Sequence, residues 1–219
     1  MTEAVRALIF DFGGVISRTL FETHPQTEAA LGLPPGTLTW RGPFAPETDA
    51  AWKAMQRDEM TERDYWRLRA REVGALIGET WDDMADFVRA ARGDAPAEVI
   101  RPEFLATLDA ANGAGLRLAI LSNELDLFYG ADFRDKLPFL AAFDVIHDAT
   151  YTGVLKPDPA AYGACLAELG ELPEACVFID DQARNIGGAR AVGLQAIHFD
   201  VTAPIESYRH VRAAVGLSS

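Results

Sequence analysis

The sequence predicts an α/β protein: a doubly wound parallel sheet with a small, all-helical cap domain. Three observations support this. Short, nearly continuous apolar segments alternate with helical patterns from Val99 to about Phe199, as in a parallel sheet covered on both faces. An earlier apolar segment, Ala7–Phe10, ends on Asp11 and is followed by two glycines. Between these regions, residues 17–98 show no strand pattern and contain all four tryptophans.

The intervening region is predicted to be a helical insertion. Thr61 followed by Asp64 resembles a capping box and predicts a helix over residues 61–74, and residues 79–92 show a second helical pattern. Pro and Gly clusters divide the earlier part into shorter pieces. We therefore predict a core domain of residues 1–16 and 99–219, with a cap of residues 17–98 inserted after the first strand.

Strands and helices alternate in the second part of the core. Each predicted helix ends at a glycine, which readily adopts the left-handed conformation found just beyond a helix. The predicted strands are residues 116–123, 141–149, 175–181 and 194–200, and the predicted helices are residues 101–115, 158–170 and 183–193.

The composition restricts the class of partner. The 219 residues carry a net charge of -13, which repels polyphosphate and argues against non-specific nucleic-acid binding. No segment approaches the ~20 apolar residues of a membrane span, and the N-terminal apolar run is too short for a signal peptide. Cys165 and Cys176 belong to no metal-binding motif, so we expect reduced thiols in a cytoplasmic protein. The sequence assigns no oligomeric state.

Polar residues gather where the predicted strands end. Ligands of an open parallel sheet bind beyond the carboxyl ends of its strands. A carboxylate there can attack phosphorus, other carboxylates can hold Mg²⁺, and a hydroxyl and an ammonium can bind the phosphate oxygens. The residues predicted at this edge are Asp11, Ser122, Asn123, Lys156, Asp180 and Asp181, and this set suits phosphoryl transfer.

With these residues in place, the chain resembles a haloacid dehalogenase-like hydrolase with a helical cap inserted after its first motif. Four motifs of that family occur in order, as "FDFGGV", "LSN", "GVLKPDP" and "FIDDQARNIGGARAVG". The resemblance covers residues 1–16 and about 99–205, whereas the cap matches only in position and helical character. It implies a Rossmann-like core, Mg²⁺ as cofactor and a small phosphorylated metabolite as substrate.

The resemblance also assigns roles to the residues that match the motifs. It implies that Asp11 is the nucleophile and that Asp180 acts on the metal through water or as an alternative ligand. Asn185 stands where many relatives carry an aspartate. The implied catalytic residues are Asp11, Ser122 and Lys156; the implied substrate-binding residues are Gly14, Ser122, Asn123 and Lys156; the implied metal ligands are Asp11, the Gly13 carbonyl, Asp181 and Asp180.

One position departs from the pattern of the family's phosphatases. They usually carry a second aspartate, which protonates the leaving group, where this chain has Gly13. General acid–base help is worth roughly 10²–10⁴ in rate. A phosphatase lacking it needs another acid, for which Glu124, Asp126 and His24 are candidates, or a substrate with a good leaving group.

Three functions therefore stay open. The first is a magnesium-dependent phosphatase that cleaves a small phosphate monoester through an aspartyl phosphate. The second is a 2-haloacid dehalogenase, which "LAILSN" resembles, but which usually has a tyrosine at the position of Gly13 and lacks the paired acids Asp180 and Asp181. The third is a weakly active or non-catalytic binding protein. The paired acids favour the phosphatase, because adjacent carboxylates raise each other's pKa unless a cation neutralises them.

Overall fold

The computed structural model describes residues 4–92 and 96–217, and its described strands form one parallel sheet. The first strand in the chain lies at the centre of the sheet, so the chain winds outward from it in both directions, as predicted. The strands are β1 (Ala7–Phe10), β2 (Arg117–Ser122), β3 (Val145–Asp148), β4 (Cys176–Asp180) and β5 (Gln195–His198), in the order β3-β2-β1-β4-β5.

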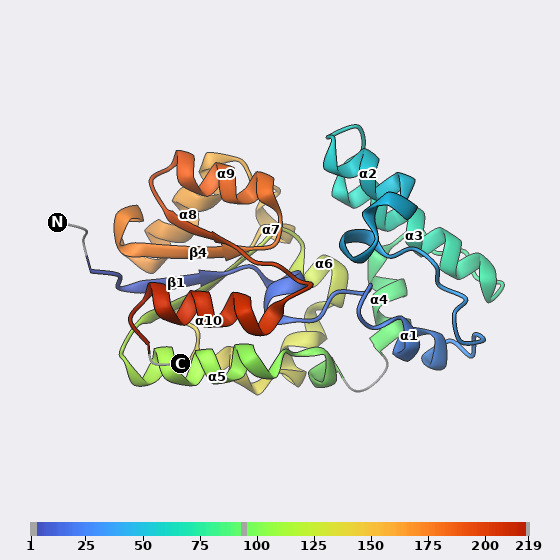
Figure 1. Ribbon diagram of the computed structural model, residues 1–219, viewed down its shortest axis with the longest axis horizontal. Helices are drawn as coiled ribbons and strands as arrows, with labels where there is room; N and C mark the ends of the chain where they lie inside the picture. Colours follow the sequence, from blue (N-terminus) through green and yellow to red (C-terminus); the bar gives the residue numbers. More distant parts are fainter. Residues whose placement is uncertain (1–3, 93–95, 218–219) are drawn as a thin grey trace. The chain divides into compact units, whose positions relative to one another are not determined.

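Helices cover both faces of this sheet (Figure 1). On one face α5 (Pro102–Gly113) lies beside α10 (Pro204–Ala214), and on the other α8 (Pro159–Leu169) lies beside α9 (Ala183–Ala191). Two short helices, α6 (Leu125–Tyr129) and α7 (Ala149–Thr152), follow β2 and β3. The sequence interpretation missed α10, whose buried positions follow a helical spacing after the proline that begins it.

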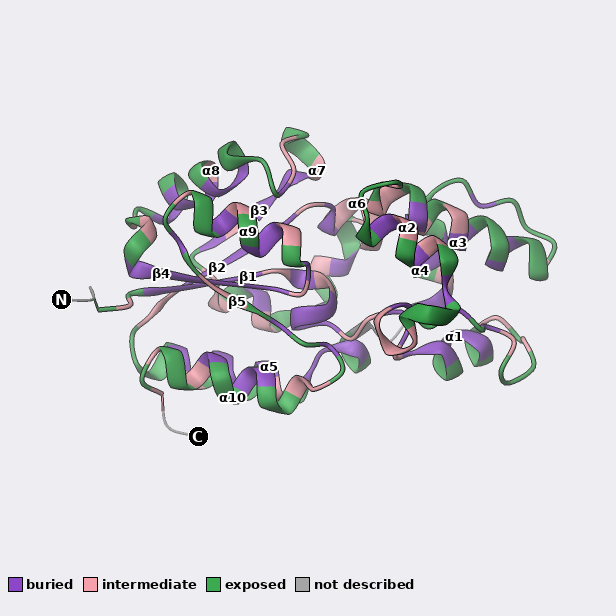
Figure 2. Ribbon diagram, turned by 45° about the horizontal axis from the view of Figure 1, so that its top comes forward, coloured by how far each residue is buried: buried purple, intermediate pink, exposed green. Residues whose placement is uncertain are grey.

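Side chains of β1 alternate between the two faces and form two apolar layers. Ala7 and Ile9 belong to the cluster that includes Tyr162 of α8. Phe10 instead meets the edge of Phe104, on α5, with ring centroids 5.6 Å apart. Figure 2 shows that β1 and β4 are buried along their length, whereas β5 at the sheet edge is partly exposed. Because packing on both faces holds these buried central strands in place, it also holds the residues at their carboxyl ends in place.

The chain divides into two compact units. The core unit contains the sheet, and the helical unit contains α1 (His24–Ala30), α2 (Ala50–Gln56), α3 (Glu62–Leu76) and α4 (Met84–Arg92). The core unit comprises Met1–Arg18, Ile100–Asp126 and Arg134–Ser219, and the helical unit comprises Thr19–Val99 and Leu127–Phe133. The sequence interpretation assigned that last segment to the core.

Aromatic side chains fill the interior of the helical unit. Phe21 lies at its centre, with ring centroids of Trp40, Trp52 and Trp66 between 5.2 and 5.4 Å away. The Thr61 hydroxyl accepts a hydrogen bond from the Asp64 amide at 3.1 Å, as the capping pattern predicted. No strand occurs among the residues described for this unit.

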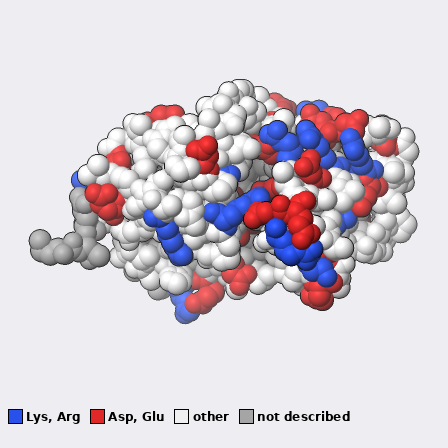
Figure 3. Space-filling view, turned by 90° about the horizontal axis from the view of Figure 1, so that it is seen from above, with Lys and Arg blue, Asp and Glu red and all other residues white. Residues whose placement is uncertain are grey.

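The sequence predicts that the chain has no membrane-spanning segment and that its two cysteines are reduced. Among the described helices, none is both long and apolar enough to cross a membrane. Cys165 and Cys176 are buried free thiols, and burial raises the pKa of Cys165 to about 12. On the face shown in Figure 3, acidic and basic side chains lie intermixed.

Candidate active site

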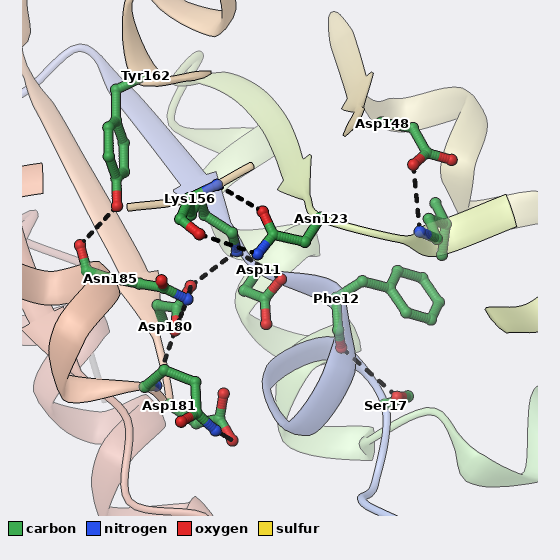
Figure 4. A network of polar contacts seen from close by, with 12 residues as sticks. Asp11, Phe12, Ser17, Asn123, Asp148, Lys156, Tyr162, Asp180, Asp181 and Asn185 are labelled. Carbon is green, nitrogen blue, oxygen red and sulfur yellow. Dashed lines mark hydrogen bonds and ion pairs between the residues drawn. The ribbon is translucent and has the colours of Figure 1, made fainter. Parts of the chain in front are cut away.

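The predicted nucleophile and the predicted lysine lie in direct contact. The backbone amide of Asp11 donates to the carbonyl of Ile179 at 2.8 Å, so the end of β1 stays paired with β4. Lys156 Nζ donates to Asp11 Oδ1 at 2.8 Å and to Asp180 Oδ2 at 2.7 Å (Figure 4). The Lys156 side chain is 1% exposed, so this ammonium is held at the carboxyl edge of the sheet.

The charges in this cluster do not balance. Burial opposes the charge on Lys156, but attraction from Asp11 and Asp180 outweighs it and raises the pKa of the lysine. Burial, together with Asp180, raises the pKa of Asp11 to about 7 against the lowering effect of Lys156. Carboxylate oxygens of Asp11, Asp180 and Asp181 all lie within 4.8 Å of one another. One lysine among three carboxylates leaves excess negative charge, which a cation would neutralise.

Asp180 is bound from several directions. Its Oδ1 accepts from the Gln182 amide at 2.7 Å, and Asn185 Nδ2 lies 3.1 Å from both carboxylate oxygens. Tyr162 in turn donates its hydroxyl to the Asn185 carbonyl at 2.7 Å. Asp180 therefore anchors Lys156 to the start of α9. The Asn185 Oδ1 atom is buried and accepts no hydrogen bond from the described residues.

The residues after β2 hold Lys156 by its main chain. Ser122 ends β2, next to β1, and therefore lies at the same edge of the sheet as Asp11. The sequence predicts that Asn123 binds substrate. In the structure its side-chain amide pairs with the backbone of Lys156, accepting from the amide at 2.7 Å and donating to the carbonyl at 3.2 Å, and its role in substrate binding stays a prediction.

The two glycines after Asp11 have different structural requirements. Gly14 has φ of +81°, and a Cβ there would lie 2.8 Å from Asp181 Oδ2, so a side chain would be both strained and blocked. Gly13 has φ of -70° and ψ of 126°, which other residues also adopt, and a Cβ there would meet no atom within 4 Å. The backbone therefore does not exclude an aspartate at position 13.

The candidate replacement acids are already engaged or buried. Asp126 accepts from Arg134 Nε on one oxygen and from the Tyr151 hydroxyl on the other, both at 2.7 Å. Glu124 is 6% exposed. His24 is 3% exposed and packs edge-on against Trp40 inside the helical unit, with ring centroids 4.2 Å apart.

Asp148 binds the start of two helices, a contact that the sequence interpretation missed. Its carboxylate accepts from the amides of Leu125 and Asp126 at the start of α6, at 3.2 and 2.9 Å, and from Thr150 in α7 at 3.0 Å. One anion thus stabilises the N-termini of two helices. Asp148 ends β3 in register with Ser122. An acidic residue at the end of a predicted strand was the sequence signal that could have identified it.

Comparisons with known proteins identify the family. The model of the haloacid dehalogenase-like hydrolases matches residues 5–193. The mouse acyl-CoA dehydrogenase family member 10 is 25% identical over 215 residues, 96% of this chain. Phosphatase MT3486 of Mycobacterium tuberculosis is 31% identical over 99 residues, 45% of this chain. The sesquiterpene phosphatase astK of Aspergillus oryzae is 25% identical over 222 residues, 99% of this chain. The chain spans 19%, 46% and 100% of these relatives, respectively.

Solved structures share the fold. A phosphatase from Thermococcus onnurineus matches with a TM-score of 0.60 and 18% identity, covering 98% of this chain and 99% of its own. An L-2-haloacid dehalogenase from Xanthobacter autotrophicus matches with a TM-score of 0.57 and 20% identity, covering 89% and 77%. Since both kinds of enzyme match to a similar degree, these structures do not separate one activity from the other. The chain belongs to the haloacid dehalogenase-like hydrolases.

Proposed function

We propose that this hydrolase is a magnesium-dependent phosphatase that cleaves a small phosphorylated metabolite in the cytoplasm. One observation carries the proposal: Lys156 bridges Asp11 and Asp180, and Asp181 adds a third carboxylate to the cluster. An excess of negative charge is unfavourable beside an anionic substrate unless a cation is bound. The relatives named as phosphatases support the same activity.

The donor set fits Mg²⁺, which prefers hard oxygen ligands and usually keeps several waters. Asp11, Asp181 and the Gly13 carbonyl would hold the ion, and Asp180 would act through water. The buried Asn185 Oδ1 supports this assignment because it lacks a donor among the described residues. When bound, Mg²⁺ would reduce the repulsion between the nucleophile and the phosphate.

With these residues, the proposed reaction proceeds in two successive displacements at phosphorus. In the first, an Asp11 carboxylate oxygen attacks phosphorus, and the ester P–O bond breaks as the alcohol leaves with the electron pair and takes up a proton. Lys156 and the Ser122 hydroxyl bind non-bridging oxygens, and the amides of the turn containing Gly14 face the phosphate. In the second, water attacks phosphorus, which releases inorganic phosphate and regenerates the Asp11 carboxylate.

Phosphate release tests this proposal. The purified protein is incubated with p-nitrophenyl phosphate and a panel of metabolite phosphates, in Mg²⁺ or in a chelator. We expect release only with Mg²⁺ and none from Asp11→Asn, whereas Asp109→Asn, which changes an exposed carboxylate on α5, keeps wild-type activity. Metal-independent halide release from a 2-haloacid would instead establish a dehalogenase. No turnover in either assay would favour a binding protein.

A further inference from the structure

Arg101 is the largest fully buried side chain among the described residues, and the sequence motifs do not include it. It follows Ile100, which forms an antiparallel bridge with Ser17, so it lies where the chain returns to the core unit. Its Nε donates to the Gly14 carbonyl at 3.0 Å. A buried cation therefore contacts the turn that follows the proposed nucleophile.

Three successive carbonyls of this turn are held from the interior of the core unit. Arg101 binds the Gly14 carbonyl through its side chain and the Ile16 carbonyl through its own backbone amide, both at 3.0 Å. Between them, the Tyr208 hydroxyl donates to the Val15 carbonyl at 2.9 Å. In a trans peptide the N–H points away from the preceding carbonyl, so these contacts fix the direction of the turn's amides as well.

The position of the guanidinium is itself supported by aromatic rings. Its central carbon lies 5.6 Å from the centroid of Phe199, and Phe199 meets the edge of Tyr208 at 5.0 Å. Burying an arginine is unfavourable unless its donors are bound, and an apolar side chain would fill the space without that cost. An apolar side chain, however, would supply no charged donor to the Gly14 carbonyl.

Gly14 in turn packs against a proposed metal ligand. A Cβ on Gly14 would lie 2.8 Å from Asp181 Oδ2, so the backbone of the turn approaches this carboxylate closely. We propose that Arg101 is a positioning residue that holds Gly14 against Asp181 and so sets the spacing of the carboxylates for the cation. The metal part of this inference rests on the proposed function.

The test measures cation binding and backbone protection separately from turnover. Titration calorimetry with Mg²⁺ alone compares wild type with Arg101→Met, and hydrogen exchange of the metal-free protein reports on the amides of residues 12–17. We expect Arg101→Met to weaken Mg²⁺ binding about 10-fold or more, as for other residues that orient metal ligands. We also expect faster exchange in the turn and, at saturating Mg²⁺, a KM within about 3-fold of wild type.

Matched variants separate positioning from loss of stability. Arg92→Met removes a buried arginine from the helical unit, and we expect it to leave Mg²⁺ affinity and the exchange of residues 12–17 unchanged. If Arg101→Met does not fold, Arg101→Lys and Tyr208→Phe carry the same test with smaller perturbations. Wild-type Mg²⁺ affinity and wild-type exchange in a folded Arg101 variant would overturn the inference. If the wild-type protein binds Mg²⁺ but releases no phosphate, the proposed function fails while the inference about Arg101 stands.

Discussion

The side-chain amide of Asn123 pairs with both backbone hydrogen-bonding groups of Lys156. Lys156 lies in the loop between α7 and α8, outside regular secondary structure, so its main chain depends on such contacts for its position. Its ammonium must reach Asp11 and Asp180 together, at 2.8 and 2.7 Å. Asn123 therefore acts on the site through the lysine, and this geometry gives the first prediction.

We predict that Asn123→Ala lowers kcat/KM by roughly 10- to 30-fold, as expected for the loss of two hydrogen bonds. In a Lys156→Met background, Asn123→Ala is expected to change kcat/KM by no more than about 2-fold, because the lysine ammonium through which Asn123 acts is absent. Steady-state kinetics of the four proteins in this double-mutant cycle measure the coupling. Asn112→Ala, on the exposed side of α5, is the control. Independent, additive effects would indicate that Asn123 contacts the substrate itself.

The space at Gly13 allows a gain-of-function experiment. A Cβ there meets no atom within 4 Å, so we predict that Gly13→Asp folds normally. A general acid helps poor leaving groups most, so kcat for an alkyl phosphate is expected to rise roughly 10-fold or more. Turnover of p-nitrophenyl phosphate, whose leaving group needs little protonation, should change much less. Gly13→Asn supplies the same bulk without the acid. If both variants instead lost turnover equally on both substrates, the result would show that the substrate occupies the space beside Gly13.

Two adjacent glycines of α9 form a matched pair for a stability measurement. A Cβ on Gly188 would lie 2.8 Å from both Cβ and the carbonyl oxygen of Pro157, whereas one on Gly187 meets nothing within 4 Å. We predict that Gly188→Ala destabilises the protein by about 1–3 kcal/mol, and that it lowers kcat because Pro157 adjoins Lys156. Gly187→Ala should stabilise it by about 0.5–1 kcal/mol. Urea unfolding gives both values, and equal effects would contradict the close packing of α9 on Pro157.

Buried His24 makes the helical unit sensitive to acid. Burial and the nearby Arg41 lower the pKa of His24 from 6.5 to about 4. Between these values the unfolded chain takes up a proton that the folded chain does not, so stability is lost as pH falls from 6.5 toward 4. The loss attributable to this histidine is on the order of 1–3 kcal/mol.

Urea unfolding followed by tryptophan fluorescence suits this measurement, because all four tryptophans lie in the helical unit. His24→Leu is expected to reduce the loss of stability between pH 6.5 and 4, where the two pKa values lie. His210→Leu, at an exposed position on α10, should keep it. A wild-type pH dependence in His24→Leu would show that other groups cause the acid sensitivity.

The sheet and the cluster around Asp11 were predictable because their signals are local. A buried apolar strand that ends on a carboxylate is visible in four or five residues, and parallel pairing then brings such ends together. Gly14 was also identifiable, since glycine often marks a close approach of the backbone.

Other parts of the site depend on contacts between residues far apart in the chain. Arg101 reaches Gly14 across 87 positions, and nothing near Arg101 in the sequence indicates that partner. The sequence likewise marked Asn123 as part of the site but not the direction of its amide, which is set by the later loop of Lys156. The role of Asp148 arises only once α6 and α7 begin beside each other.

The segment Leu127–Phe133 has a consequence for protein engineering. Phe128 and Tyr129 pack against the aromatic interior of the helical unit, and Tyr129 stacks on Phe133 at 4.5 Å, although this segment follows β2 in the chain. The helical unit is therefore not one continuous segment of the chain that can be exchanged by itself. A chimera that exchanges only residues 19–99 with another member of the family would leave Phe128 and Tyr129 facing a foreign interior. Exchange of the helical unit thus needs two crossover regions, chosen together.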